Sequence, residues 1–149
     1  MINPIVSDLA AVRVTVRVAV DPATAFDVFT TEIDEWYRKG ATVLTQAPRG
    51  STLRFEPGVG GRLLEVRDDG SPPRVRGHIT VWEPGARLLF VDRRDAEVEI
   101  WFHGFEAGTR VVLEHRGLDK LPPDAAYKAS KYSWRKLVDY FAEHMEETR

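Results

Sequence analysis

Two polar side chains lie within apolar stretches of the sequence, and these are the side chains that we expect to do chemistry. His115 follows Val111 and Leu113 at alternate positions, and Glu65 interrupts the apolar run 63–66. An imidazole can orient a ligand or transfer a proton near neutral pH, and a carboxylate can act as an acid, a base or a ligand anchor. His115 and Glu65 are therefore the candidate catalytic residues, although the sequence does not decide whether the protein is an enzyme.

Each of these two residues also has an ordinary structural interpretation. His115 can be a core histidine that makes a single hydrogen bond. Glu65 follows two consecutive leucines, so its side chain faces the core or the solvent according to which leucine points inward. If it faces inward, Glu65 can pair with His115 or with Arg62.

Signals for a metal or a nucleotide are weak. His78, His103, His115 and His144 show no paired metal-ligand spacing and the chain has no cysteine, so we expect no metal and no cofactor. His103 and His144 are expected on the surface.

The glycine-rich segment 58–61 resembles a phosphate-binding loop, but an apolar strand pattern follows it instead of a helix, which favours a hairpin turn.

The periodicity of apolar residues predicts the elements that position these side chains. Strand patterns cover 12–20, 52–56, 61–67, 74–83, 86–93, 96–105 and 109–116, with turn residues between them. Asp21-Pro22 begins one short helix, and the capping-box pattern at 31–34 begins a second, which ends near Gly40. A last helix is indicated by an apolar stripe of Trp134, Leu137, Val138, Phe141, Ala142 and Met145.

This order predicts an α+β fold in which a curved, seven-stranded antiparallel sheet surrounds a long C-terminal helix. Two short helices lie between strands 1 and 2. A two-residue turn at Ala107-Gly108 would place Phe102 opposite Leu113 and Ile100 opposite His115, on the concave face. Glu97 and Glu99 alternate with apolar residues and are expected on the solvent face.

Composition limits the class of protein. The chain has 149 residues, 43% of them hydrophobic, and a net charge of −2, so we expect one domain over residues 1–149. The charge balance argues against nucleic-acid binding, and the basic residues at 128–136 are expected to form a solvated helix face. Arg13 and Arg17 interrupt the longest N-terminal apolar stretch, so we expect a cytoplasmic protein without membrane insertion.

The aromatic residues suggest a pocket, with a well-packed core as the alternative. The expected ligand-binding residues are Trp36, Phe55, Glu65, Phe90, Phe102, His115, Trp134 and Phe141. Trp101 alternates with Glu99 and His103 on the predicted outer face and is flanked by Phe105. An apolar patch there predicts a homodimer or partner surface.

Several local stretches resemble the START-like or Bet v 1-like (SRPBCC) superfamily, in its activator of Hsp90 ATPase homologue 1-like (AHSA1-like) branch. These stretches are 55–62 (FEPGVGGR), 77–79 (GHI), 82–84 (WEP), 87–90 (RLLF), 97–100 (EVEI), 108–111 (GTRV), 113–117 (LEHRG) and Trp134 with Leu137. The resemblance covers residues 12 to 145 and implies the helix-grip fold.

The same resemblance implies two functions. Members of the superfamily include lipid carriers, aromatic polyketide cyclases and chaperone activators. We therefore expect a small, largely apolar ligand, aromatic or lipid-like, in a cavity between the sheet and the C-terminal helix. Cyclase- or dehydratase-like chemistry would use His115 or Glu65. The alternative is a module that interacts with an Hsp90-type chaperone.

Overall fold

The computed structural model describes residues 11–37, 51–92, 95–120 and 131–149. The elements of these segments are β1 (Ala11–Val18), α2 (Pro22–Thr31), α3 (Ile33–Tyr37), β2 (Ser51–Phe55), β3 (Arg62–Arg67), β4 (Arg74–Glu83), β5 (Arg87–Asp92), β6 (Glu97–Phe105), β7 (Gly108–Arg116), the 3-10 turn η1 (Leu118–Lys120) and α5 (Lys131–Thr148). The order of strands and helices is the one that the sequence predicts.

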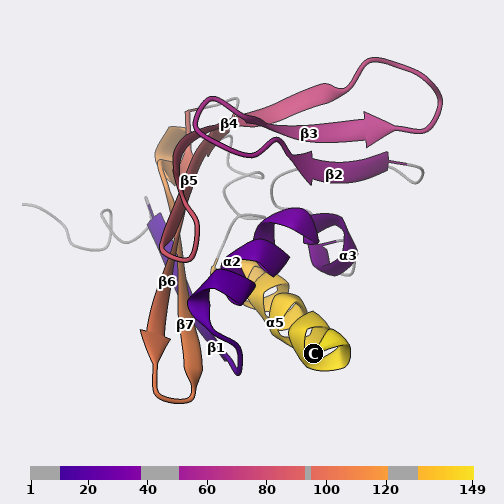
Figure 1. Ribbon diagram of the computed structural model, residues 1–149. Helices are drawn as coiled ribbons and strands as arrows, with labels where there is room; N and C mark the ends of the chain where they lie inside the picture. The colour runs from indigo at the N-terminus through magenta and orange to yellow at the C-terminus, as the bar shows by residue number, and fades with distance from the viewer. Residues whose placement is uncertain (1–10, 38–50, 93–94, 121–130) are drawn as a thin grey trace, which may run out of the picture.

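The strands form one seven-stranded sheet in the order β1-β7-β6-β5-β4-β3-β2, and every neighbouring pair is antiparallel. Register shifts interrupt the β3–β4 pairing at Leu63/Leu64 and the β4–β5 pairing at Ile79/Val81. Such bulges bend strands and increase their twist. Figure 1 shows the result, with the β2–β3 arm lying over α2 and α3 while β6, β7 and β1 form the other wall.

The helices fill the concave side of this curled sheet. α2 begins at Pro22, a residue suited to the first helical position, and it packs against β6 and β2. The predicted start of the second helix at the 31–34 pattern is slightly wrong, because α2 continues through Thr31 and α3 begins at Ile33. Thr31 Oγ1 donates to the carbonyl of Asp27 at 2.6 Å and so belongs to the turn before it. Gly40 lies outside the described residues.

The apolar stripe of α5 confirms the predicted C-terminal helix. Trp134, Leu137, Val138, Phe141 and Met145 are buried, and Ala142 is partly buried against the same core. α5 packs on β1 and on α3, so the helix is held inside the curve of the sheet. This arrangement is the helix-grip fold. No helix within the described segments is long and apolar enough to cross a membrane.

The predicted register between β6 and β7 is wrong by two residues. Phe102 lies opposite Val111, and His115 lies opposite Val98. The turn consists of residues 106 and 107 because Phe105 pairs with Gly108. A shift of two residues leaves every side chain on its original face, so the expected inward orientation of His115 is unaffected.

The glycine-rich segment between β2 and β3 forms a turn, as the sequence predicts. Gly58 and Gly60 adopt positive φ angles of 94° and 86° in the loop between β2 and β3, which confirms a turn because a strand follows it.

Glu99 is predicted on the solvent face, yet it is only 5% exposed. It lies between Arg87, at 3.2 Å, and Arg116, at 2.8 Å. The long arginine side chains cover the carboxylate, which strand alternation cannot show.

Candidate functional site

His115 is buried on the concave face of β7. Its side chain is 1% exposed, and its neighbours across the sheet are Val98 on β6 and Val12 on β1. The indole Nε1 of Trp134, on α5, donates a hydrogen bond to His115 Nδ1 at 2.9 Å. This hydrogen bond therefore joins the sheet to the helix that it surrounds.

This hydrogen bond determines the tautomer of His115. An indole N–H can only donate, so Nδ1 must accept, and the proton of a neutral imidazole then resides on Nε2. Nε2 is buried and has no hydrogen-bond partner within the described part of the chain. His115 thus presents an unsatisfied N–H donor in the interior. A buried donor without a partner costs about 1–3 kcal/mol of stability. An acceptor that bound to Nε2–H would remove this cost.

His115 remains neutral at physiological pH. Burial lowers its pKa to about 4, and the charge of Asp92 offsets this effect only in part. Because Nδ1 is occupied by Trp134 and Nε2 carries the proton, the ring has no free lone pair with which to accept another proton. This geometry suits a hydrogen-bond donor better than a general base.

The Glu65 side chain lies on the face of the sheet that packs against the core. It lies opposite Leu53 on β2, just as Leu63 lies opposite Phe55, and all three of these apolar residues belong to the core. The Glu65 side chain is fully buried. The alternation of Leu53 and Phe55 along β2 therefore contained the information needed to choose the face, once the β2–β3 hairpin register was known.

The partners of Glu65 are not the predicted ones. Arg76 Nη2 donates to Glu65 Oε1 at 2.7 Å and Arg67 Nε donates to Oε2 at 3.4 Å, whereas Arg62 pairs with Glu56. Burial alone would raise the pKa of Glu65, but the two arginines outweigh it and lower the pKa. The carboxylate is therefore ionised and already engaged, which makes it a poor general base.

The β3–β4 bulge explains why Arg76 reaches Glu65. Gly77 pairs with Leu63 and Val75 pairs with Leu64, so Arg76 is the extra residue of β4. Its side chain is only 9% exposed, and its Nε has no hydrogen-bond partner among the described residues. The concave face thus carries a second buried N–H donor beside the ion pair.

The predicted aromatic lining residues pack largely on one another. Trp36, Phe141 and Phe29 form a cluster with ring centroids 4.9–5.4 Å apart, and Trp36 Nε1 donates to the carbonyl of Phe29. Phe102 contacts Phe29 and Phe26. Trp36, Phe102 and Phe141 therefore belong to the packed core, and their role in lining a ligand pocket stays a prediction.

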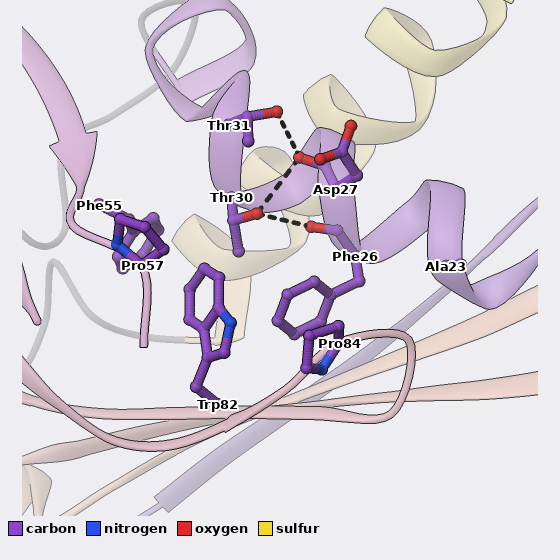
Figure 2. A pocket seen from close by; sticks show the side chains of 9 residues that line it. All are labelled: Ala23, Phe26, Asp27, Thr30, Thr31, Phe55, Pro57, Trp82 and Pro84. Atoms are coloured by element: carbon purple, nitrogen blue, oxygen red, sulfur yellow. Dashed lines mark hydrogen bonds between the residues drawn. The ribbon is translucent and has the colours of Figure 1, made fainter. Parts of the chain in front are cut away.

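A pocket of about 390 Å³ lies between α2 and the strands that face it. Figure 2 shows its lining, which consists of Ala23, Phe26, Asp27, Thr30, Thr31, Phe55, Pro57, Trp82 and Pro84. Phe55 belongs to the predicted set, and its ring also contacts Phe90, with centroids 5.5 Å apart. The volume suits a small organic molecule, and the walls are mostly apolar.

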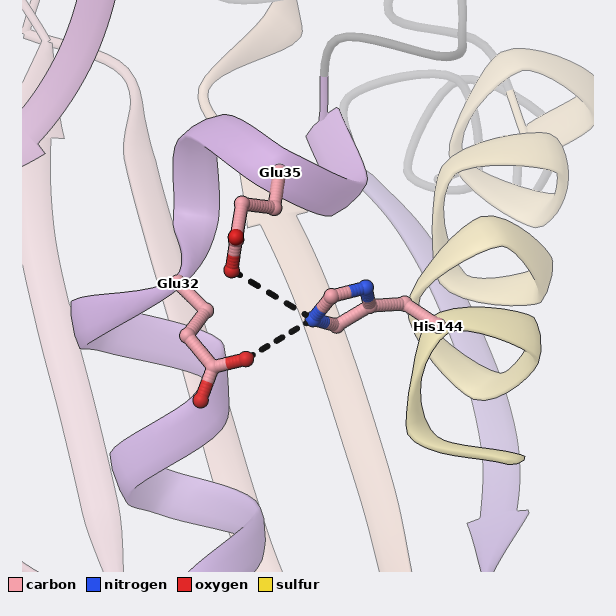
Figure 3. Close-up of side chains that lie close together, drawn as sticks. All are labelled: Glu32, Glu35 and His144. Carbon is pink, nitrogen blue, oxygen red and sulfur yellow. Dashed lines mark hydrogen bonds and ion pairs between the residues drawn. The ribbon is translucent and has the colours of Figure 1, made fainter. Parts of the chain in front are cut away.

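A polar cluster that the sequence does not predict joins α5 to the α2–α3 junction (Figure 3). His144, which was expected on the surface, is 6% exposed. Its Nε2 lies 2.9 Å from Glu32 Oε1 and 3.7 Å from Glu35 Oε2. His144 faces α3 rather than solvent because α5 packs against α3, a contact that helix periodicity does not show.

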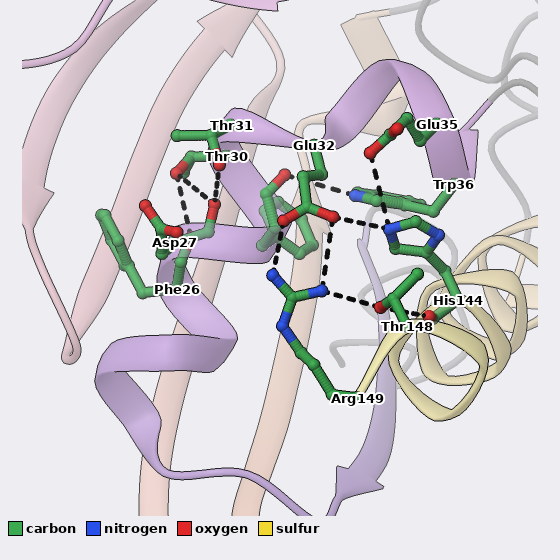
Figure 4. A network of polar contacts seen from close by, with 11 residues as sticks. Phe26, Asp27, Thr30, Thr31, Glu32, Glu35, Trp36, His144, Thr148 and Arg149 are labelled. Carbon is green, nitrogen blue, oxygen red and sulfur yellow. Dashed lines mark hydrogen bonds and ion pairs between the residues drawn. The ribbon is translucent and has the colours of Figure 1, made fainter.

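Arg149 completes this cluster, as Figure 4 shows. Its Nη2 donates to Glu32 Oε2 at 2.7 Å, and Thr148 accepts a second hydrogen bond from its Nη1. Partial burial would raise the pKa of Glu32, but hydrogen bonds from His144 and Arg149 lower it. Glu32 is therefore a carboxylate held on both oxygens.

Trp101 lies on the outer face of β6, opposite Val112 on β7. Its indole is partly buried, and the guanidinium of Arg13 lies over the ring at 5.6 Å. Phe105, on the same face, is 42% exposed with Arg17 over its ring. The predicted homodimer surface at Trp101 stays a prediction.

Comparison with known proteins agrees with the fold. The model of the family described as "Activator of Hsp90 ATPase homolog 1-like protein" matches residues 19–146. No curated protein matches the sequence. Among solved structures, a protein from Mesorhizobium loti is 20% identical, with 93% of this chain and 98% of that chain covered and a TM-score of 0.67.

Two other solved structures are similar over most of their length. The AHSA1-like protein from Aeromonas hydrophila is 19% identical, with 92% of each chain covered and a TM-score of 0.61. A protein from Nitrosomonas europaea is 14% identical, with 100% of this chain and 99% of that chain covered and a TM-score of 0.66. At these identities the likeness concerns the fold alone.

Proposed function

The chain belongs to the activator of Hsp90 ATPase homolog 1-like family, and from this membership and the buried His115 donor we propose that it binds a small, largely apolar molecule between the sheet and α5. The observation that carries the proposal is the unpartnered Nε2–H of His115. His115 on β7 and Trp134 on α5 belong to the two elements that would enclose the ligand. Neither residue lines the pocket beside α2. A ligand oxygen would satisfy the donor that the protein leaves open.

The ligand is aromatic or lipid-like and carries a hydrogen-bond acceptor such as a carbonyl or ether oxygen. The strand neighbours of His115, Val12 and Val98, are apolar, which favours a ligand body without charge. A neutral imidazole that already accepts from Trp134 orients such a ligand without taking a proton from it. The hydrogen bonds at His115 and Glu65 therefore support binding more than cyclase- or dehydratase-like turnover.

The experiment is a thermal-shift measurement with matched ligand pairs, for example 2-acetylnaphthalene against 2-ethylnaphthalene. A ligand at about 100 times its dissociation constant adds about 2.7 kcal/mol, which raises the melting temperature by about 5–10 °C. We expect the ketone to bind about 2- to 10-fold more tightly than the hydrocarbon, as one neutral hydrogen bond allows.

Variants of His115 make the test specific. His115→Phe removes the donor and should abolish the preference for the ketone, whereas His115→Gln keeps both a donor and an acceptor and should retain part of it. The matched control is His103→Gln, which changes an exposed histidine on β6. An equal preference in wild-type protein and His115→Phe would refute the role of His115.

The alternative function, interaction with an Hsp90-type chaperone, is supported by the name of the family, activator of Hsp90 ATPase homolog 1-like protein. Function resides in surfaces that a shared fold does not specify. Purified Hsp90-type protein should bind the chain and hydrolyse ATP faster in its presence if this alternative holds. Neither effect is expected if the ligand-binding proposal describes the whole function.

A further inference from the structure

The cluster of Glu32, Glu35 and His144 has the composition and geometry of a metal site. The nearest carboxylate oxygens and His144 Nε2 all lie within 4.8 Å of one another. Nε2 is 2.9 Å from Glu32 Oε1 and 3.7 Å from Glu35 Oε2. In a tetrahedral zinc site with bonds of about 2.0–2.2 Å, neighbouring donor atoms are about 3.4 Å apart. The two observed distances bracket that separation, so small side-chain rotations bring the donors into position.

The donors come from two elements that their packing already holds together. Glu32 and Glu35 lie at the α2–α3 junction, and His144 lies on α5. The His144 side chain is 8% exposed, so its ring is fixed, whereas the Glu35 side chain is 63% exposed. Solvent can therefore reach the cluster from the side of Glu35, which leaves an entry path for a cation.

Arg149 orients the Glu32 carboxylate in this cluster. Its Nη2 donates to Oε2 at 2.7 Å, while Oε1 lies 2.9 Å from His144 Nε2 and has only a longer contact, 3.5 Å, with Arg149 Nη1. Metal-binding carboxylates usually have their second oxygen held by a hydrogen bond of this kind, which orients the first. An ionised Glu32 can only accept, so His144 Nε2–H donates a hydrogen bond to it in the absence of a metal. A cation would take the place of that shared proton.

We propose that Glu32, Glu35 and His144 bind one divalent transition-metal cation, with Zn²⁺ as the preferred ion. One imidazole and two carboxylates suit Zn²⁺ better than Ca²⁺ or Mg²⁺, which favour all-oxygen ligands. The cation would tie the C-terminal part of α5 to the end of α2. Thr31, the residue before Glu32, lines the α2 pocket, so the cation would also hold one wall of that pocket in place.

The test is a titration of chelator-treated full-length protein with Co²⁺, followed by the visible absorption of the bound ion, and then competition with Zn²⁺. We expect one equivalent of Co²⁺ to bind and Zn²⁺ to displace it. Zn²⁺ should also raise the melting temperature. Glu35→Gln and His144→Gln should each weaken binding by at least about tenfold, since even residues that only support metal ligands have effects of that size.

Controls separate this site from exposed histidines. His103→Gln, which alters an exposed residue of β6, should bind Co²⁺ as tightly as the wild type. Glu35 is largely exposed, so Glu35→Gln should remain folded even if His144→Gln does not. An unchanged Co²⁺ affinity in Glu35→Gln, or a loss of binding in His103→Gln, would overturn the proposal. Failure to bind any Co²⁺ or Zn²⁺ would overturn it as well.

Discussion

Replacing Glu65 by Leu is expected to lower the free energy of unfolding by about 3–5 kcal/mol, the usual cost of removing one partner of a buried ion pair. The substitution leaves the Arg76 guanidinium, whose side chain is 9% exposed, without its carboxylate at 2.7 Å. Arg67, at 3.4 Å from the same carboxylate, is 32% exposed and can turn to solvent. Urea unfolding of the wild type and the variant measures the difference.

The double variant Glu65→Leu/Arg76→Met is the matched control. It removes both charges and keeps much of the side-chain volume, so most of the lost stability should return. Recovery would show that the single variant loses stability through the stranded charge of Arg76. If the single variant loses less than about 1 kcal/mol, solvent reaches Arg76 and the pair is not buried as described.

Acidification should destabilise the protein through His115. The unfolded chain has an ordinary histidine pKa of 6.5, and the folded pKa is about 4, so between these values the unfolded state binds more protons. Stability is therefore complete above about pH 6.5 and decreases as the pH falls toward about 4. This single group should remove about 2–3 kcal/mol between about pH 7 and about pH 4.

His115→Gln isolates this contribution from that of other titrating groups. Glutamine can still accept the hydrogen bond from Trp134 Nε1 but does not titrate. Urea unfolding at both pH values should show a smaller acid loss in His115→Gln than in the wild type, by about 2–3 kcal/mol. Equal acid losses would mean that His115 is protonated in the folded protein, which would contradict its apolar burial.

Local periodicity predicted most of the fold. The valine alternation of β1 and the apolar stripe of α5 depend on strand and helix geometry alone, and both lie where the sequence places them. The position of His115 on the concave face followed from the same alternation. An error of two residues in the β6–β7 register left that prediction intact because strand side chains alternate with period two.

The partners of the site residues could not be predicted in this way. Arg76 reaches Glu65 because a bulge adds one residue to β4. Gly77, inside the strand beside Arg76, is a signal for a bulge, but it does not indicate that Glu65 is the partner of Arg76. Trp134 meets His115, and His144 meets Glu32, only because α5 packs in one particular orientation. These contacts arise from tertiary packing, so sequence spacing carries little information about them.

The pairing of β1 with β7 has a consequence for how the chain folds. Val14 lies opposite Leu113, and Val18 lies opposite Thr109. The first strand therefore gains a neighbour in the sheet only after the last strand has been synthesised. Contacts between such distant segments must overcome a large loop-closure entropy and slow folding. During synthesis, the valine-rich face of β1 is exposed until β7 has left the ribosome. The nascent chain is then at its most vulnerable to aggregation, and a chaperone that covers this one strand would protect it.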